Sequence, residues 1–228
     1  MAAAPAIELA DLTRRYGKRV TLQNVTLTLP AGATLVVFRP NGAGKSTLLR
    51  VLATLLRPHA GTVRVLGRAL PDEGWAVRGR IGLLGHAPLL YRDLSGRENL
   101  AYHARLHGVV PERARELLER VGLSARADDK VHTYSRGMVQ RLAVCRAVLH
   151  DPEVLLLDEP LANLDPAAAE LVEPLIGASS GRTRIVTSHD PAGGLAQADL
   201  ALGLRAGRAD LVAPAAEIDA ARIGALYR

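Results

Sequence analysis

The sequence predicts an α/β fold in which a phosphate-loop core with a mainly parallel sheet carries an antiparallel β edge and an inserted helical arm. The short apolar runs TLVVF (34–38), VLLLD (154–158) and RIVTS (184–188) are typical of strands in a parallel sheet covered on both faces. The first run leads directly into a glycine-rich segment, FRPNGAGKST (38–47). From about residue 97 to 150 the pattern is helical.

The N-terminal part is expected to form strands around the glycine-rich loop. Residues 7–9 and 20–29 alternate apolar and polar side chains, as half-buried antiparallel strands do. The apolar helix after the loop should run to about Leu56, because Pro58 cannot continue it. The segment TVRVLG (62–67) then predicts another strand.

The remaining elements follow from the same patterns. IGLLG (81–85) is expected to be a buried strand, and AAAELVEPLIGA (167–178) a helix between two strands of the core. From about residue 199 the sequence predicts a hairpin followed by a short helix. Because no internal repeat or low-complexity linker divides the sequence, we expect one domain over residues 1–228, with a helical subdomain at about 87–150.

The composition indicates a globular chain. Hydrophobic residues make up 48% of the 228 residues, which argues against global disorder. We expect no membrane span, since no window approaches about 18 uncharged apolar residues, and no signal peptide. The net charge of +6 rests on scattered arginines without a basic cluster, so no nucleic-acid partner is expected. A single cysteine, Cys145, fits a cytoplasmic location.

The glycine-rich segment is almost a phosphate-binding loop of the pattern G-x-x-x-x-G-K-S/T. Gly44, Lys45 and Ser46 match its end, and the strand before and helix after it supply the expected context. Backbone N–H groups from Gly42 to Thr47 are expected to point at phosphate oxygens, with Lys45 between the β- and γ-phosphates and Ser46 on Mg²⁺. The alternative is a glycine-rich turn that Ser46 caps.

One residue departs from the loop pattern, since Arg39 stands where the first glycine belongs. Glycine there permits a positive φ, which costs a non-glycine residue about 1–3 kcal/mol. If the local backbone is β-like, the arginine side chain turns outward at little cost. We therefore expect ATP still to bind, with Arg39 tuning its affinity or the stability of the loop.

Two adjacent carboxylates end a buried strand in VLLLDEP (154–160). Ligands of open α/β sheets bind at the carboxyl ends of the strands, which is where this pair should lie. Asp158 is expected to hold Mg²⁺, usually through water, and Glu159 to orient or deprotonate an attacking water. The alternative, a solvated acidic pair at a strand end, is weakened by the neighbouring phosphate loop.

A third motif, YSRGMVQR (134–141), lies shortly before the acidic strand, and with it the chain resembles the nucleotide-binding subunit of an ABC transporter. The resemblance implies the ABC ATPase fold with a P-loop NTPase core, and ATP and Mg²⁺ as cofactors. It also implies a head-to-tail homodimer that holds each ATP between one phosphate loop and the partner's signature. Separate integral membrane permease subunits are implied, with this chain peripheral at the cytoplasmic face of the inner membrane.

The resemblance also implies roles for individual residues. In the signature Ser135 and Gly137 match positions that touch the γ-phosphate bound by the opposite subunit, although the residues after each depart from the family's LSGGQ pattern. Tyr16 matches the aromatic residue that stacks on adenine, with a packed surface tyrosine as the alternative. Asp165 belongs to a loop that communicates across the dimer, or merely caps a helix, and His189 matches the switch histidine on the γ-phosphate.

Together these assignments define the expected site. Lys45, Glu159 and His189 are the expected catalytic residues, and Ser46 and Asp158 the expected Mg²⁺ ligands. The residues expected to contact ATP are Tyr16, Asn41, Gly42, Ala43, Gly44, Lys45, Ser46, Thr47, His86, Ser135, Gly137 and Asp165.

One further departure bears on the transported substrate. His86 stands where the family has a glutamine that senses Mg²⁺ and faces the membrane subunit; it either shares that role or is a neutral substitution. The segment GHAP (85–88) with the later ENL (98–100) is similar to the ATP-binding subunit of the cytochrome c maturation haem exporter, the CcmA type. Haem export is therefore the expected function, with export of drugs, lipids or other small molecules as the nearest alternative.

Two alternatives of other classes remain. Arg39, His86 and Arg136 motivate a regulatory module that binds ATP without hydrolysing it, against which stand Lys45 and the acidic pair. DNA-associated ATPases of the same family carry a long coiled coil or further domains, which this sequence does not show.

Overall fold

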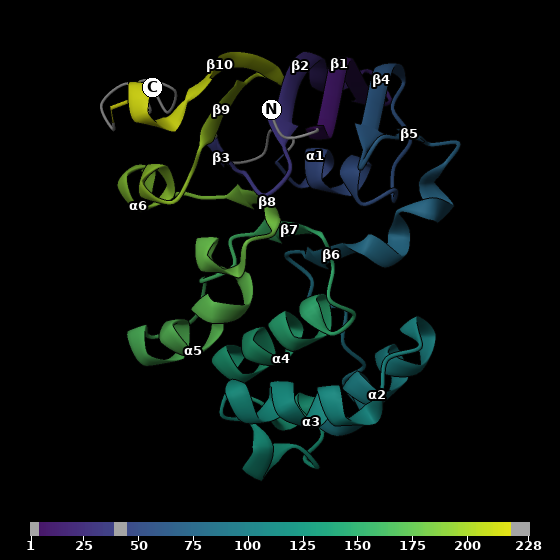
Figure 1. Ribbon diagram of the computed structural model, residues 1–228, viewed down its shortest axis with the longest axis vertical. Coiled ribbons are helices and arrows are strands. Elements are labelled where there is room, and N and C mark those ends of the chain that lie inside the picture. The colour runs from purple at the N-terminus through teal and green to yellow at the C-terminus, as the bar shows by residue number, and fades with distance from the viewer. Residues whose placement is uncertain (1–4, 39–44, 220–228) are drawn as a thin grey trace.

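The computed structural model describes residues 5–38 and 45–219, with the backbone alone at residue 45 (Figure 1). Their strands form one sheet in the order β5-β4-β1-β2-β10-β9-β3-β8-β7-β6. The strands are β1 Pro5–Tyr16, β2 Arg19–Pro30, β3 Thr34–Phe38, β4 Ala60–Val65, β5 Arg68–Leu70, β6 Ile81–Leu84, β7 Val154–Asp158, β8 Thr183–Thr187, β9 Leu200–Arg205 and β10 Arg208–Pro214. The α-helices are α1 Lys45–Leu52, α2 Gly96–His107, α3 Pro111–Arg120, α4 Arg136–Val148, α5 Pro166–Ile176 and α6 Pro191–Ala196. Short 3₁₀ turns lie at Gly74–Ala76, Arg78–Arg80, Ser124–Arg126, Val131–Thr133, Ala178–Ser180 and Ala215–Glu217.

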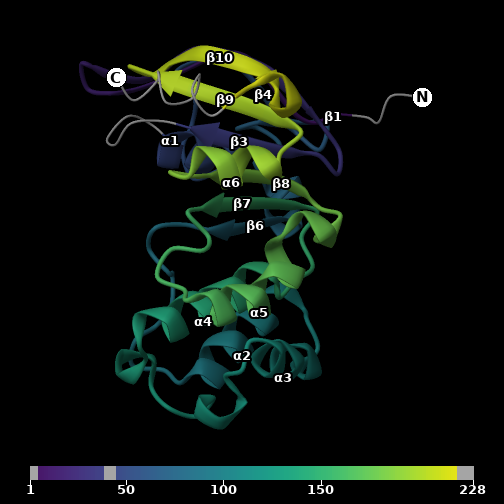
Figure 2. The same cartoon turned by 90° about the vertical axis from the view of Figure 1, so that its left-hand side faces the viewer.

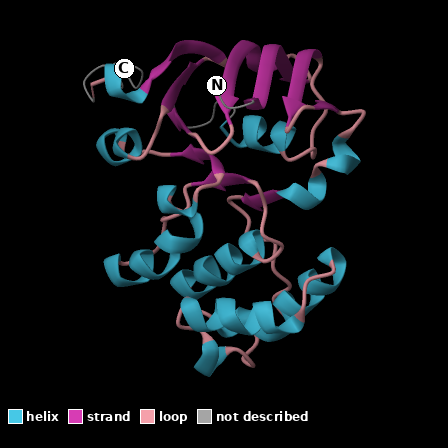
Figure 3. Cartoon of the chain, in the orientation of Figure 1, coloured by secondary structure: helices cyan, strands magenta, loops and turns pink. Residues whose placement is uncertain are grey.

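The elements separate into a sheet region and a helical region. Strands fill the upper part of the molecule, and α2, α3 and α4 gather in the lower part (Figures 1 and 3). The view from the side shows α4 and α5 below β6 and β7, and α6 beside β3 and β8 (Figure 2). We call α2, α3 and α4 the helical subdomain. No helix of the described ranges is both long enough and apolar enough to cross a bilayer.

The centre of the sheet is parallel, as the apolar runs predict. Strands β9, β3, β8, β7 and β6 are parallel neighbours, with Val36 opposite Val186 and Leu156 opposite Ile185. All five residues of β3 are buried, because Leu35 and Val37 share a hydrophobic cluster with the leucines of α1 and because α6 also contacts the strand. The whole sheet is mixed, because β10 pairs antiparallel with β9 and because β2, β1, β4 and β5 pair antiparallel with one another, while β10 joins β2 in parallel. The predicted parallel core with an antiparallel edge is thus confirmed.

The first strand is longer than its alternation predicts. The strand continues through polar residues to Tyr16. Shifts in its register with β2 change which side chains of β1 face the core, so the apolar–polar alternation is interrupted. At one of these shifts Asp11 has a φ of 53°. Gly61 of β4 packs directly onto this bend, where a Cβ would overlap the carbonyl oxygens of Ala10 and Asp11. Periodicity alone does not reveal such a bend.

Two predicted boundaries are wrong for identifiable reasons. The helix expected to reach about Leu56 ends at Leu52, because Thr54 adopts a φ of 63° and Leu55 N donates to Arg50 O at 2.9 Å. The strand expected over 62–67 ends at Val65, where Leu66 and Gly67, both with positive φ, form a two-residue hairpin turn. The predicted C-terminal hairpin is β9 and β10, and only a 3₁₀ turn follows it within the described residues.

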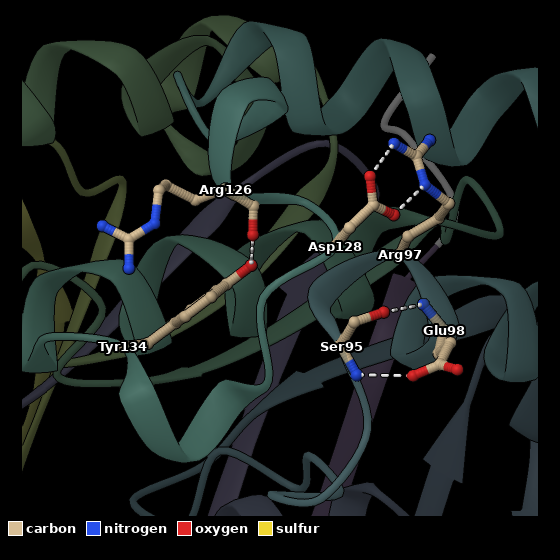
Figure 4. Close-up of polar contacts among 6 residues, drawn as sticks. All are labelled: Ser95, Arg97, Glu98, Arg126, Asp128 and Tyr134. Carbon is tan, nitrogen blue, oxygen red and sulfur yellow. Dashed lines mark hydrogen bonds and ion pairs between the residues drawn. The ribbon is translucent and has the colours of Figure 1, made fainter.

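Polar side chains hold the start of the helical subdomain together. Ser95 and Glu98 form a reciprocal capping box at the N-terminus of α2 (Figure 4). The Tyr134 hydroxyl, from the turn before α4, donates to Arg126 O at 2.6 Å (Figure 4). Gly96 lies against this tyrosine, so closely that a Cβ there would overlap the hydroxyl oxygen. The fold therefore requires glycine at this position for packing.

We expect Gly96→Ala to lower the free energy of unfolding by about 1–3 kcal/mol, the usual cost of overpacking. Thermal or urea unfolding measures the effect. Gly79→Ala is the matched control, since a Cβ there meets nothing within 4 Å. Equal stability of the Gly96→Ala and Gly79→Ala variants would contradict the packing role of Gly96.

A group of basic side chains joins the helical subdomain to β6. Arg146 of α4 donates to Leu83 O, and the His150 ring lies 3.0 Å from Ile81 O and stacks on His107 at 4.1 Å between ring centres. Burial, helped by the charge of Arg146, lowers the pKa of His103 to about 4 and also lowers the pKa of His107. Burial likewise lowers the pKa of His150. These histidines are neutral in the folded chain at neutral pH.

This group should make the protein sensitive to mild acid. The unfolded chain binds protons at these histidines near pH 6.5, whereas the folded chain resists protonation down to about pH 4 at His103. Stability is therefore fully present above pH 6.5 and is lost as the pH falls through this window. We expect the melting temperature of His103→Phe to fall less between pH 7 and pH 5 than that of the parent. The exposed His132→Gln variant is the control, and an unchanged acid response in His103→Phe would contradict this assignment.

Candidate functional site

The predicted acidic residues lie at the carboxyl ends of the parallel strands, beside the start of α1. Asp158, the last residue of β7, accepts a hydrogen bond from Ser46 Oγ at 2.9 Å through Oδ2. Its other oxygen, Oδ1, accepts from Thr187 Oγ1 of β8 at 2.7 Å. One carboxylate thus ties together β7, β8 and the first turn of α1. Ser46 and Asp158 are the two residues predicted to hold Mg²⁺, and the structure brings them into direct contact.

The oxygen atoms at this point suit Mg²⁺. A carboxylate and a hydroxyl oxygen are hard ligands, and Mg²⁺ in nucleotide sites is held by few protein oxygens, with water and phosphate supplying the rest. Among the described residues no group of three or more His, Cys, Asp or Glu side chains could hold a metal ion. Here Mg²⁺ would neutralise phosphate charge, held by Ser46 and by Asp158 through water.

Glu159 follows directly and is held in an unusual backbone conformation. Its φ is 52°, and its N–H donates to Thr187 Oγ1 at 3.0 Å. A positive φ in a non-glycine residue costs about 1–3 kcal/mol, and such strain clusters at functional sites. The threonine hydroxyl both donates to Asp158 and accepts from the Glu159 backbone, so it fixes the two acids relative to each other. Thr187 was not predicted, because a threonine in a β-branched strand reads as an ordinary strand former.

Glu159 and His189 form the second contact of the site. His189 Nε2 lies 2.7 Å from Glu159 Oε1, and both side chains are about two-fifths exposed, at 42% and 39%. The histidine comes from the loop between β8 and α6, the glutamate from the loop after β7. The two predicted catalytic residues are therefore adjacent, at a place that solvent and a ligand can reach.

The loop after Glu159 contacts the start of α4 within the same chain. Gln140 of α4 donates to Pro160 O at 2.8 Å, and a Cβ at Gly137 would lie 3.3 Å from Asn163 O. Asn163 itself has a φ of 64°. Asp165 is exposed and caps α5 by accepting from Ala168 N at 2.8 Å. The contact from Gln140 was not predicted, because no sequence pattern marks it.

The signature lies at the N-terminus of α4. Ser135 is exposed and caps the helix, its Oγ accepting from Met138 N at 3.2 Å. The hydroxyl of Ser135 thus bonds to its own helix, whereas Asp158 accepts from Ser46 and Thr187.

The other predicted ligand contacts are placed as follows. Tyr16 ends β1, is 43% exposed, and has the Arg14 guanidinium 5.1 Å from its ring centre. His86 is exposed after β6 and lines a pocket with Arg136 and Asn163. Thr47 is buried in the first turn of α1. Arg39, Asn41, Gly42, Ala43, Gly44 and the Lys45 side chain lie outside the described residues.

Comparison with known proteins gives consistent matches. A model of the ABC transporter family matches residues 22–162, more than half of the chain. The chain is 43% identical over 192 residues to a daunorubicin resistance ATP-binding protein of Streptomyces coeruleorubidus. That match covers 81% of this chain and 60% of the relative. It is 35% identical over 189 residues to a Nod factor export ATP-binding protein of Cupriavidus metallidurans. That match covers 80% of this chain and 62% of the relative. The chain thus spans about three-fifths of the length of these curated relatives.

A solved structure matches over nearly the whole chain. It is the dimeric post-hydrolysis state of an ATP-binding cassette bound to ADP and Pi, with a TM-score of 0.82 and 25% sequence identity. The match covers 92% of this chain and 98% of that one.

Proposed function

The chain belongs to the ABC transporter family, and from this premise we propose that it binds and hydrolyses ATP as the nucleotide-binding subunit of a membrane exporter. The observation that carries this proposal is the Glu159–His189 contact of 2.7 Å, next to the hydrogen-bonded pair Ser46 and Asp158. Together these residues supply a base and a metal-binding pair at one edge of the sheet.

In the proposed reaction a water attacks the γ-phosphate of ATP. Glu159 accepts a proton from this water as the new P–O bond forms and the bond from phosphorus to the β–γ bridging oxygen breaks. His189 positions the Glu159 carboxylate and faces the γ-phosphate. Lys45, the amides of residues 42–47 and Tyr16 bind the nucleotide, while Mg²⁺ held at Ser46 and Asp158 supplies charge stabilisation.

The complete site is proposed to need two copies of the chain. Ser135 and Gly137 would contact the γ-phosphate bound by the opposite copy, with Asp165 at the same interface. The exposed Ser135 at the N-terminus of α4 supports this arrangement, because a helix N-terminus favours a phosphate group. The dimeric relative bound to ADP and Pi supports it independently.

The permease subunits are proposed to dock beside His86, along residues 87–110. Several large apolar side chains are exposed in this segment, which a partner would cover. They are Leu89, Tyr91, Tyr102, Leu106 and Val110. The chain would then be a peripheral protein at the cytoplasmic face of the inner membrane, with no nucleic-acid partner.

We propose small-molecule export as the transport function, because the relatives are named for daunorubicin resistance and Nod factor export. Haem export is the second candidate, and the segment around His86 favours it. Inverted membrane vesicles containing this chain and its co-purified permease test both. We expect ATP-dependent accumulation of daunorubicin; accumulation of haem instead would select the second candidate, and ATP-dependent loss of substrate from the vesicles would contradict export.

The remaining alternative is a regulatory module that binds ATP without turnover. ATP binding without phosphate release, in the presence of the permease, would replace the ATPase proposal with that one.

A further inference from the structure

An arginine lies inside the sheet, where its neighbours are apolar. Arg184, the second residue of β8, is only 2% exposed. Its guanidinium donates to Thr34 Oγ1 at 3.1 Å, to Ile176 O at 3.0 Å and to Gln197 O at 3.2 Å. These acceptors come from β3, the end of α5 and the residue after α6.

All three acceptors are neutral. Of the five N–H groups of a guanidinium, these bonds use three. No carboxylate forms an ion pair with Arg184 among the described residues, although Glu173 and Asp199 lie near enough to act on its charge. Burial lowers the pKa of Arg184, since a buried charge without a paired anion is unfavourable.

Arg184 lines a pocket beside α6. The strand register places Thr34 opposite Arg184 and Val36 opposite Val186, and all four side chains line the same pocket. Its volume is about 340 Å³, within the range of small-molecule sites. Figure 2 shows α6 lying beside β3 and β8. These two strands supply Thr34, Val36, Arg184 and Val186 to the pocket.

The pocket has a buried end that carries a positive charge and an exposed end that carries two carboxylates. Thr34 and Arg184 are almost fully buried, while Glu159, His189 and Asp190 line the exposed end. Apolar side chains line the wall between the two ends, among them Val36, Leu161 and Val186. A single negative charge at the buried end would meet the guanidinium of Arg184.

We propose that this pocket binds a small, mainly apolar molecule carrying one carboxylate, with the carboxylate on Arg184 and the apolar body against Val36 and Val186. The carboxylate supplies the anion that the guanidinium lacks and accepts from its two remaining N–H groups. The bound molecule also contacts the segment that carries His189. Any effect on ATP turnover rests on the proposed function, but the binding itself does not.

The test uses two probes of matched shape, 4-fluorobenzoate and the neutral 4-fluorobenzyl alcohol, titrated against the full chain by ¹⁹F NMR. We expect the benzoate to bind at least about tenfold more tightly, the usual value of a charge-assisted hydrogen bond. In Arg184→Gln the benzoate should lose about this tenfold preference over the alcohol. In Val186→Phe, which fills the pocket from its floor, both probes should lose binding.

Circular dichroism and the melting temperature establish that each variant is folded. If Arg184→Gln does not fold, two other measurements decide whether the pocket binds a carboxylate. They are the relative affinity of the parent for the two probes and the loss of benzoate binding in Val186→Phe. Equal binding of both probes to the parent, or unchanged benzoate binding in Val186→Phe, would overturn the proposal. Absence of ATP turnover with benzoate binding intact would contradict the proposed function and leave this site standing.

Discussion

Replacing Glu159 with glutamine is expected to lower the rate of ATP hydrolysis by about 10²-fold or more, the usual contribution of a general base. Glutamine keeps the size and the hydrogen-bonding reach of the side chain but cannot take a proton from water. The contact with His189 at 2.7 Å can persist, because the amide oxygen still accepts. ATP should therefore still bind, and the trapped ATP should hold two copies together.

Phosphate release measures turnover, and filtration binding of labelled ATP measures affinity. Glu119→Gln, an exposed glutamate on α3 away from the site, is the matched control and should behave like the parent. Turnover within a few-fold of the parent in Glu159→Gln would remove the proposed role of this carboxylate. Loss of ATP binding in the same variant would instead indicate a structural role.

Asp158→Asn is expected to weaken Mg²⁺-dependent ATP binding by roughly 10–100-fold, as loss of outer-shell metal partners does. The variant is close in shape and can keep one acceptor oxygen, for Ser46 Oγ, but it loses the negative charge and the acceptor for Thr187 Oγ1. Without that charge the site should no longer distinguish ATP with Mg²⁺ from ATP alone. ATP affinity measured with Mg²⁺ and with EDTA gives the result directly.

The exposed Asp72→Asn, in the loop after β5, is the control for this change of charge. An unchanged ratio of the two affinities in Asp158→Asn would show that Asp158 is not the Mg²⁺ partner. Turnover should fall together with the Mg²⁺ response.

Much of the site could be predicted because its chemistry is carried by short segments at strand ends. The apolar run VLLL fixes the strand, so the two acids after it had to lie at the carboxyl edge of a parallel sheet. His189 follows β8 in the same way, and parallel pairing brings it next to Glu159.

What could not be predicted depends on contacts between distant segments. Thr187 aligns both acids through one hydroxyl, but a threonine in a β-branched strand reads as an ordinary strand former. Arg184 looks like an exposed residue at a strand start, and its burial depends on carbonyl groups at the ends of α5 and α6. The bends in β1 come from its pairing with two neighbours.

The most direct test of the central claim, hydrolysis of ATP in a composite site of two chains, is phosphate release by the parent measured over a range of protein concentrations. A site shared by two copies predicts that the activity per chain rises with concentration and then levels off as dimers form. Activity per chain that is the same at every concentration would contradict the shared site, and no release at any concentration, with or without the permease, would contradict hydrolysis itself.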